Sequence, residues 1–162
     1  MQHSGGTARG FSLLEMMAVL AVIAILALIA LPSYMDKIVR EQVAESLPLA
    51  DLAKPAIQAA WLAGAPLPAD NAAAGLPAPE KIVGNFVGSV KVDRGAVHIA
   101  FGNKAHSALK GKVLTVRPAG VEDARIVPLT WLCGPAKAPA PMVAQGKDQT
   151  SVAVALLPIR CR

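Results

Sequence analysis

Residues 10–31 read GFSLLEMMAVLAVIAILALIAL, and this segment decides how the chain is organised. Its last 16 residues carry no polar or charged side chain. As a helix, the 22 residues from Phe11 to Pro32 would be about 33 Å long, close to the roughly 30 Å of a bilayer's hydrocarbon core. A helix that is apolar on every side needs a membrane or a large surrounding domain, and the rest of the chain is too small to enclose it. We therefore expect residues 11–34 to span a membrane.

A short polar leader, MQHSGGTARG, precedes the apolar segment. In a secretory signal peptide the small-residue cleavage site follows the apolar part instead. No A-x-A-like site stands directly after Leu31, where the sequence leads into charged residues. We therefore expect the apolar segment to stay in the mature protein. Arg9 in the leader favours a cytoplasmic N-terminus, with the rest of the chain on the other side of the membrane.

One carboxylate, Glu15, interrupts the start of the apolar segment. A carboxylate at the centre of a membrane helix costs about 2.5–3.5 kcal/mol on insertion scales. If the chain is cut between Gly10 and Phe11, the new α-amine of Phe11 is positive at neutral pH and can neutralise Glu15 of the same or a neighbouring subunit. The alternative is that Glu15 sits at headgroup level because it is near the helix start.

Residues 9–15, RGFSLLE, lead directly into the apolar helix, and this arrangement resembles the prepilin-peptidase site of type IV pilins and pseudopilins. The resemblance implies that a membrane aspartic peptidase cuts after Gly10 and that the new amine of Phe11 is N-methylated. The short leader and the Phe start are similar to those of the type IVa class. Pro32 matches the proline that bends the N-terminal helix in this family, whereas Leu52 stands where the family usually has a second proline.

An amphipathic pattern continues the apolar helix through residues 35–63. Apolar residues recur there at intervals of three and four, with charged residues between them. Pro48 and Pro55 each lack the backbone N–H that a regular helix uses, so we expect kinks at both positions. Trp61 is expected to pack this helix against the rest of the chain.

Residues 64–162 are predicted to form a globular head. Residues 64–81 are rich in Ala, Pro and Gly, which indicates an irregular surface loop. Strand-like segments follow, and residues 93–95, DRG, predict a hairpin between the first two. An antiparallel sheet of this size needs a cover for one face, and the amphipathic helix can supply it. The predicted fold class is α+β, with four strands at residues 82–92, 96–101, 112–117 and 128–133.

Two cysteines, Cys133 and Cys161, stand 28 positions apart near the C-terminus. In an exported chain such a pair favours a disulfide, which would add about 3–4 kcal/mol of stability in the chain-entropy model. The sequences TWLCG, residues 130–134, and LPIRCR, residues 157–162, also resemble pilins. By that resemblance, residues 133–161 form the family's disulfide-bounded region, which type II secretion pseudopilins generally lack.

The head is basic, with twelve Lys and Arg against six Asp and Glu after Gly64. A basic head could bind DNA or another anionic partner. The alternative is an ordinary surface with interspersed charges, since the sequence has no basic run and no interleaved aromatic residues. The candidate contacts, all in expected loops, are Lys104, Lys110, Lys112 and Arg125.

No catalytic constellation is present in the sequence. The three histidines are dispersed, and His98 alternates with apolar neighbours as a surface residue of a strand would. No glycine-rich stretch has a phosphate-loop pattern, and no cofactor is expected. Metal binding is not expected either, because the acidic residues Asp93, Glu122 and Asp123 lie in turns, where they occur for ordinary structural reasons. The chain is predicted to be a substrate of enzymes and not an enzyme.

The function that the resemblance implies is that of a structural subunit of a type IV pilus. Its expected partners are other copies of itself, the prepilin peptidase and methyltransferase, and the pilus assembly machinery. The precursor would lie in the bacterial inner membrane and the mature subunit in an extracellular filament. That filament would serve adhesion to host or abiotic surfaces, twitching motility or DNA uptake. The alternatives are a minor pilin that binds DNA and a pseudopilin of a type II secretion system.

Overall fold

The computed structural model describes residues 10–162, apart from the side chains of residues 31–33. The leader, residues 1–9, therefore lies outside the described residues, and so does the side chain of Pro32. The chain divides into two compact units, Met1–Asp36 and Lys37–Arg162, and each is described by itself.

The first unit consists of the N-terminal part of helix α1, Leu13–Ser46. Every residue from Leu13 to Ala30 is exposed, whereas the core helix of a soluble protein would be mostly buried. Within residues 10–162, α1 supplies the one helical segment that is long and apolar enough to cross a membrane. The predicted apolar helix is confirmed, and Pro32 lies inside it without ending it.

The amphipathic part of the helix continues into the second unit and changes its winding at both prolines. The 3-10 helix η1, Leu47–Ala53, has Pro48 in its first turn, and helix α2, Lys54–Leu62, has Pro55 in its first turn. The interruptions expected from the two missing N–H donors are therefore confirmed. One stripe of this helical run is buried, with spacings of three and four: Val39, Val43, Leu47, Ala50, Ala53, Ile57 and Trp61.

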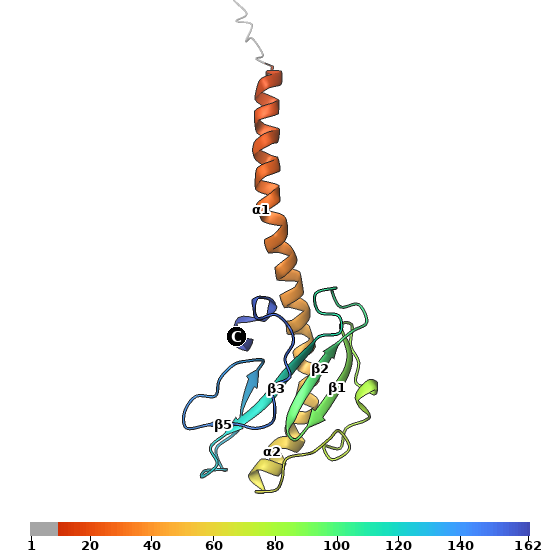
Figure 1. Ribbon diagram of the computed structural model, residues 1–162, viewed down its shortest axis with the longest axis vertical. Helices are drawn as coiled ribbons and strands as arrows, with labels where there is room; N and C mark the ends of the chain where they lie inside the picture. The colour runs from red at the N-terminus through yellow and green to blue at the C-terminus, as the bar shows by residue number, and fades with distance from the viewer. Residues whose placement is uncertain (1–9) are drawn as a thin grey trace, which may run out of the picture. The chain divides into compact units, whose positions relative to one another are not determined.

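The head contains an antiparallel sheet, as predicted, so the fold class is α+β. Its strands lie in the order β1-β2-β3-β4, and a short β5 pairs with the end of β3 (Figure 1). The strand bounds are Val87–Asp93, Ala96–Phe101, Val113–Gly120, Thr130–Cys133 and Val143–Ala144. The first strand begins five residues later than predicted, because residues 82–86 turn back and the N–H of Gly84 bonds to the carbonyl of Val87.

The inner face of the sheet packs on the helical stripe and forms the core. Val90, Ile99 and Leu114 come from three neighbouring strands, and none of them is exposed. Trp61 is 3% exposed and packs on β3, as predicted, where a Cβ on Gly120 would come within 2.5 Å of its ring. The amphipathic helix therefore covers this face of the sheet.

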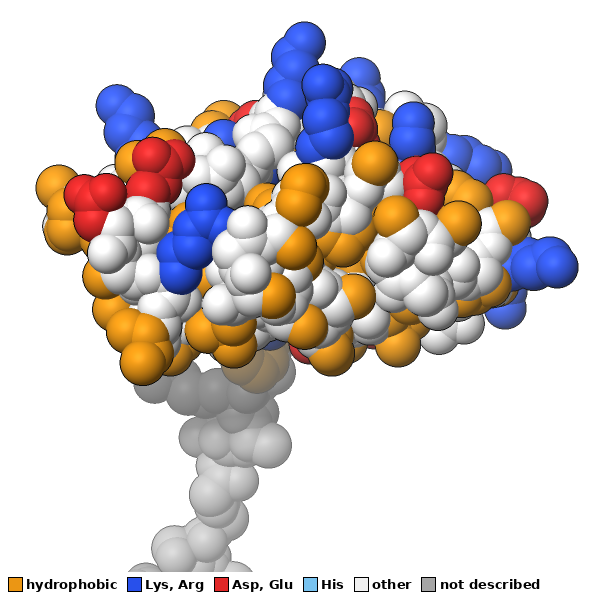
Figure 2. Space-filling model, turned by 90° about the horizontal axis from the view of Figure 1, so that it is seen from below, with side chains coloured by type: hydrophobic (Ala, Val, Ile, Leu, Met, Phe, Trp, Pro, Cys, Tyr) orange, Lys and Arg blue, Asp and Glu red, His pale blue; other side chains and the backbone are white. Residues whose placement is uncertain are grey.

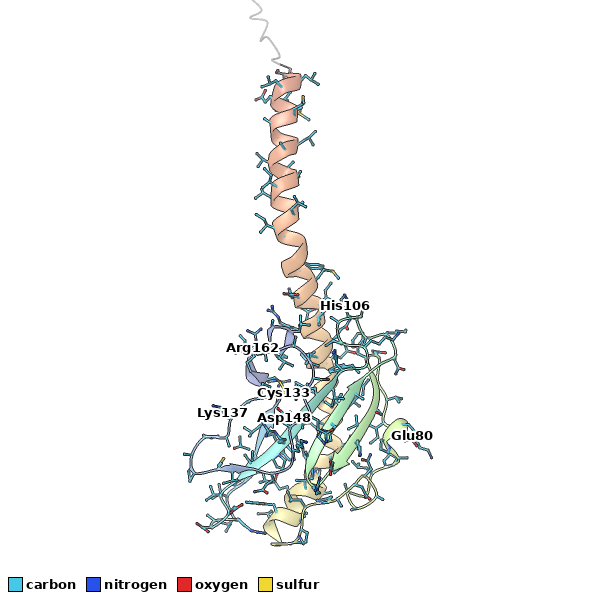
Figure 3. The ribbon with its side chains drawn as sticks, in the orientation of Figure 1. Glu80, His106, Cys133, Lys137, Asp148 and Arg162 are labelled. Carbon is cyan, nitrogen blue, oxygen red and sulfur yellow. A yellow bond between two sulfur atoms is a disulfide. The ribbon has the colours of Figure 1, made fainter. Side chains whose placement is uncertain are left out.

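The outer face of the sheet is covered as well, by the Cys-bounded region. Cys133 and Cys161 form the expected disulfide (Figure 3). Within the region, the N–H of Gln149 bonds to Thr115 Oγ1 on β3, and the N–H of Ser151 bonds to the carbonyl of Val113. The prediction that His98 is a surface residue is wrong, because this cover leaves His98 only 6% exposed.

The loop before the sheet, residues 64–81, is irregular as predicted, but it carries one buried polar side chain. Asn71 is 4% exposed and lies against the outer edge of β1. Its Nδ2 donates to the carbonyl of Val90 at 3.0 Å, and its Oδ1 accepts from the N–H of Val92 at 2.7 Å. Asn71 thereby occupies backbone groups that an unpaired edge strand would offer to another chain.

Candidate processing and assembly site

The expected cleavage point lies on exposed chain before the first helix. Gly10, Phe11 and Ser12 are not helical, and Phe11 is 77% exposed. A Cβ on Gly10 would meet no atom within 4 Å, and the backbone there has no positive φ. The fold of the described residues therefore gives no reason for a glycine at this position, which points to recognition by another protein.

Ser12 and Glu15 together organise the start of α1. The hydroxyl of Ser12 accepts the N–H of Leu14 at 3.3 Å, and its carbonyl accepts the N–H of Met16 at 3.1 Å. Glu15 lies in the first turn, where a negative charge is favoured by the helix dipole. Among the described residues no hydrogen bond or ion pair involves the Glu15 carboxylate. The Ser12 cap was missed from the sequence, although Ser-x-x-Glu is a known start signal of helices.

The four basic residues singled out in the sequence do not form one group. Lys104, Lys110 and Lys112 share the loop of residues 102–112, which joins β2 to β3. Arg125 follows β3, and its guanidinium lies 5.0 Å from the centre of the Trp61 ring. The two loops lie at opposite ends of β3, which at about 3.3 Å per residue is some 25 Å long.

Charges on one face of the head are mixed. Figure 2 shows Lys and Arg side chains along one border of the face in view, with Asp and Glu side chains between them. On this face the interspersed pattern weighed from the sequence is the one observed. A single DNA-contact surface built from all four candidate residues is not supported.

The pKa of the His98 imidazole departs clearly from its ordinary value. Burial lowers the pKa of the His98 imidazole below 6.5, and Asp93 and Asp148 partly oppose this effect. Its Nδ1 lies 3.0 Å from Thr115 Oγ1, and its Nε2 is buried without a hydrogen-bond partner. Because the ring is buried, we assign it a packing role.

The described residues hold no set of three His, Cys, Asp or Glu side chains that could bind a metal ion. A pocket of about 220 Å³ lies between η1 and β4. Its charged lining residues are Asp51, Lys54 and Arg160. Lys54 pairs with Asp51 at 2.6 Å and lies 5.1 Å from the centre of the Trp131 ring. Because this lysine is already engaged, the pocket offers no free nucleophile.

Two protein-family models match this chain. A model of the prokaryotic N-terminal methylation motif matches residues 7–31, and a model of the pilin family, described as a bacterial filament, matches residues 39–162. The chain belongs to the pilin family. The first match contains Gly10, Phe11 and Glu15, and the second contains the whole sheet and the disulfide.

Individual pilins are similar over most of this chain. The type IV major pilin protein PilE1 of Neisseria gonorrhoeae is 35% identical over 160 residues, covering 95% of this pilin and 87% of the relative. A fimbrial protein of Neisseria meningitidis serogroup B is 32% identical over 148 residues, covering 91% and 85%. The fimbrial protein EcpC of Eikenella corrodens is 45% identical over 84 residues, about half of each chain. This pilin is therefore a structural subunit of a filament, whereas the roles of its single residues stay predictions.

Proposed function

We propose that this pilin is made as a membrane-anchored precursor, is cut between Gly10 and Phe11, and polymerises through its N-terminal helix into a type IV pilus. The observation that carries the proposal is the exposed, non-helical bond at residues 10–11 that leads directly into a capped apolar helix. The precursor has its leader in the cytoplasm and its head in the periplasm, and the mature subunit is extracellular.

Cleavage changes both the size and the charge of the helix start. Before the cut, Phe11 has a neutral amide nitrogen and the nine other leader residues precede Gly10. After the cut, the amine of Phe11 is a cation that stays positive when it is N-methylated. A neighbouring subunit's Glu15 can pair with this cation, and the buried pair is stable only when both charges are present. Correct stagger between packed helices is thereby favoured over other arrangements.

The partners of this pilin follow from the same steps. A prepilin peptidase with methyltransferase activity acts on residues 10–11, and the pilus assembly machinery takes the subunit from the inner membrane. The filament serves adhesion, twitching motility or DNA uptake, the roles that the resemblance implies. Its disulfide-bounded region, closed by Cys133 and Cys161, favours a pilus over a secretion pseudopilus.

The deciding experiment replaces Gly10 in a host that makes no other pilin. For Gly10→Ala, we expect uncut chain in the membrane and no sheared filaments, measured by mass spectrometry of both fractions. The matched control is Gly6→Ala within the leader, which should leave processing and assembly intact. Normal filaments built from the uncut Gly10→Ala chain would overturn the proposal.

A further inference from the structure

One end of the head concentrates basic residues away from acidic ones. The loop of residues 102–112 and the C-terminal residues 153–162 together contain five of the twelve Lys and Arg of the head. None of the six Asp and Glu of the head lies in either segment. These six acids lie elsewhere in the head, at Asp70, Glu80, Asp93, Glu122, Asp123 and Asp148.

Both basic segments are attached to the same part of α1. The N–H of His106 donates to Gln42 Oε1 at 2.8 Å, which ties the 102–112 loop to the helix. Arg40 Nε and Arg162 Nη2 both donate to the carbonyl of Ala155, at 3.2 and 3.1 Å, which ties the C-terminus to the helix. His106 and Arg162 accordingly lie on either side of α1 in Figure 3. We call this group the basic collar: Arg40, Lys104, Lys110, Lys112, Arg160 and Arg162.

The nearby carboxylates leave the collar positive. Glu41 pairs with Lys37 at 3.9 Å, and Glu45 accepts from Asn85 Nδ2 at 3.1 Å. With Asp36, which lies four residues before Arg40, and Asp51, which lines the same pocket as Arg160, four carboxylates lie near the six cations of the collar. The loop lysines are exposed, and among the described residues none of them has an ion-pair partner. The three loop lysines are therefore accessible to negative charge from outside the subunit.

The chain connection limits how far the collar can lie from the membrane surface. Arg40 follows Leu31, the end of the apolar run, by nine positions, which is about 13 Å along a helix. The headgroup layer extends roughly 5–8 Å beyond the hydrocarbon core, and charges act over a further 8 Å or so at physiological salt. A cluster of basic residues at that distance is attracted to anionic headgroups.

We propose that the basic collar binds the headgroups of anionic phospholipids while the precursor is anchored in the membrane. The inference rests on the membrane anchoring that the proposed function contains. A consequence is that the head is held at the membrane surface until the subunit is withdrawn for assembly. The contact is electrostatic, so high salt weakens it.

The test uses the full chain, reconstituted in vesicles of phosphatidylcholine alone or with about one third phosphatidylglycerol. Hydrogen exchange of the amides in residues 102–112 and 153–162 is measured at low salt and in 0.5 M NaCl. We expect exchange to be several-fold slower in the anionic vesicles at low salt, and equal in the two vesicles at high salt. The triple variant Lys104→Gln, Lys110→Gln, Lys112→Gln should lose most of this protection.

A matched triple variant, Lys91→Gln, Lys137→Gln, Lys147→Gln, removes the same charge outside the collar and should keep the protection. Equal exchange in both vesicles, or equal loss in both triple variants, would overturn the inference. Protection by duplex DNA in neutral vesicles, without any response to phosphatidylglycerol, would overturn it in favour of a nucleic-acid surface. Failure of the chain to float with neutral vesicles would instead refute the anchoring step of the proposed function, and the collar inference with it.

Discussion

At the scale of single residues, His98 shows how the head depends on a neutral imidazole. The ring lies on the outer face of the sheet, opposite Lys91 on β1 and hydrogen-bonded to Thr115 on β3. Its Nε2 has no partner, so a proton added to the ring would place a charge in a buried site that can satisfy only one of the two nitrogens.

This environment predicts a pH dependence of stability. The pKa of His98 is lower in the folded state than the ordinary 6.5 of the unfolded chain, so the unfolded chain takes up the proton first. The contribution of His98 is complete above about pH 6.5 and is lost as the pH falls toward the folded pKa, with a slope of up to about 1.4 kcal/mol per pH unit. Urea unfolding of the detergent-solubilised chain at several pH values measures it. The variant His98→Gln should flatten this slope, and an unchanged slope would contradict the assignment.

Asn71 is the second residue with a large predicted effect. Replacing it by Ala removes its bonds to the N–H of Val92 and the carbonyl of Val90, both of which lie in a buried place. We expect Asn71→Ala to lower the free energy of unfolding by about 2–4 kcal/mol. The control is Asn85→Ala, which removes an exposed bond to Glu45 and should cost less than about 1 kcal/mol. If urea unfolding showed equal losses of unfolding free energy for Asn71→Ala and Asn85→Ala, Asn71 would not stabilise the head through its bonds to the edge of β1.

At the scale of elements, the sequence predicted the helices and strands well. It did not predict that residues 134–151 cover the outer face of the sheet. The stripe from Val39 to Trp61 repeats every three or four residues, so its helical form is a local property of the sequence. The segment of residues 134–151 has no such period. It is positioned by the disulfide and by side-chain bonds such as that of Thr150 Oγ1 to the N–H of Thr115. His98 was therefore misplaced, since its burial depends on a segment about 50 residues away in sequence.

The disulfide is expected to matter most for this cover. In the double variant that carries both Cys133→Ala and Cys161→Ala, the free energy of unfolding should fall by about 3–4 kcal/mol, because the unfolded chain gains the entropy of an open loop. Hydrogen exchange should rise more at residues 148–151 than in the β1–β2 hairpin, which does not depend on the bridge. Reducing the disulfide of the wild-type chain breaks the same bridge without a substitution and should give the same pattern of exchange. A uniform rise over the whole head would show that the bridge does not act locally.

At the scale of the whole molecule, the proposed function predicts that Glu15 couples the folded subunit to its neighbours. Replacing it by Leu removes the charge that the Phe11 amine needs in an apolar filament core. We expect Glu15→Leu to be cut normally and to accumulate in the membrane, with sheared filaments reduced at least tenfold. The measurement is the ratio of the two fractions, and Met16→Leu is the control that changes a neighbouring apolar residue. Wild-type filament yield from Glu15→Leu would exclude the ion pair as an assembly requirement.

The candidate site was predictable only where it is contiguous. Gly10, Phe11 and Glu15 stand within six residues, so the motif is complete in the sequence. The basic residues behave differently. Lys112 and Arg125 are near each other in sequence, but β3 carries them to opposite ends of the sheet. Arg162 is far from Lys104 in sequence, yet the two segments that carry them are tied to the same part of α1, through His106 and Ala155.

Because the space around Gly10 is empty, selection for a stable fold and selection for filament formation should give different results at this position. A library of variants sorted only for folded, stable subunits would accept almost any side chain at position 10, because none of the described atoms would be touched. A library sorted for surface filaments should return glycine at that position. Stability measurements alone would therefore class Gly10 as unimportant, although the proposed processing step depends on it.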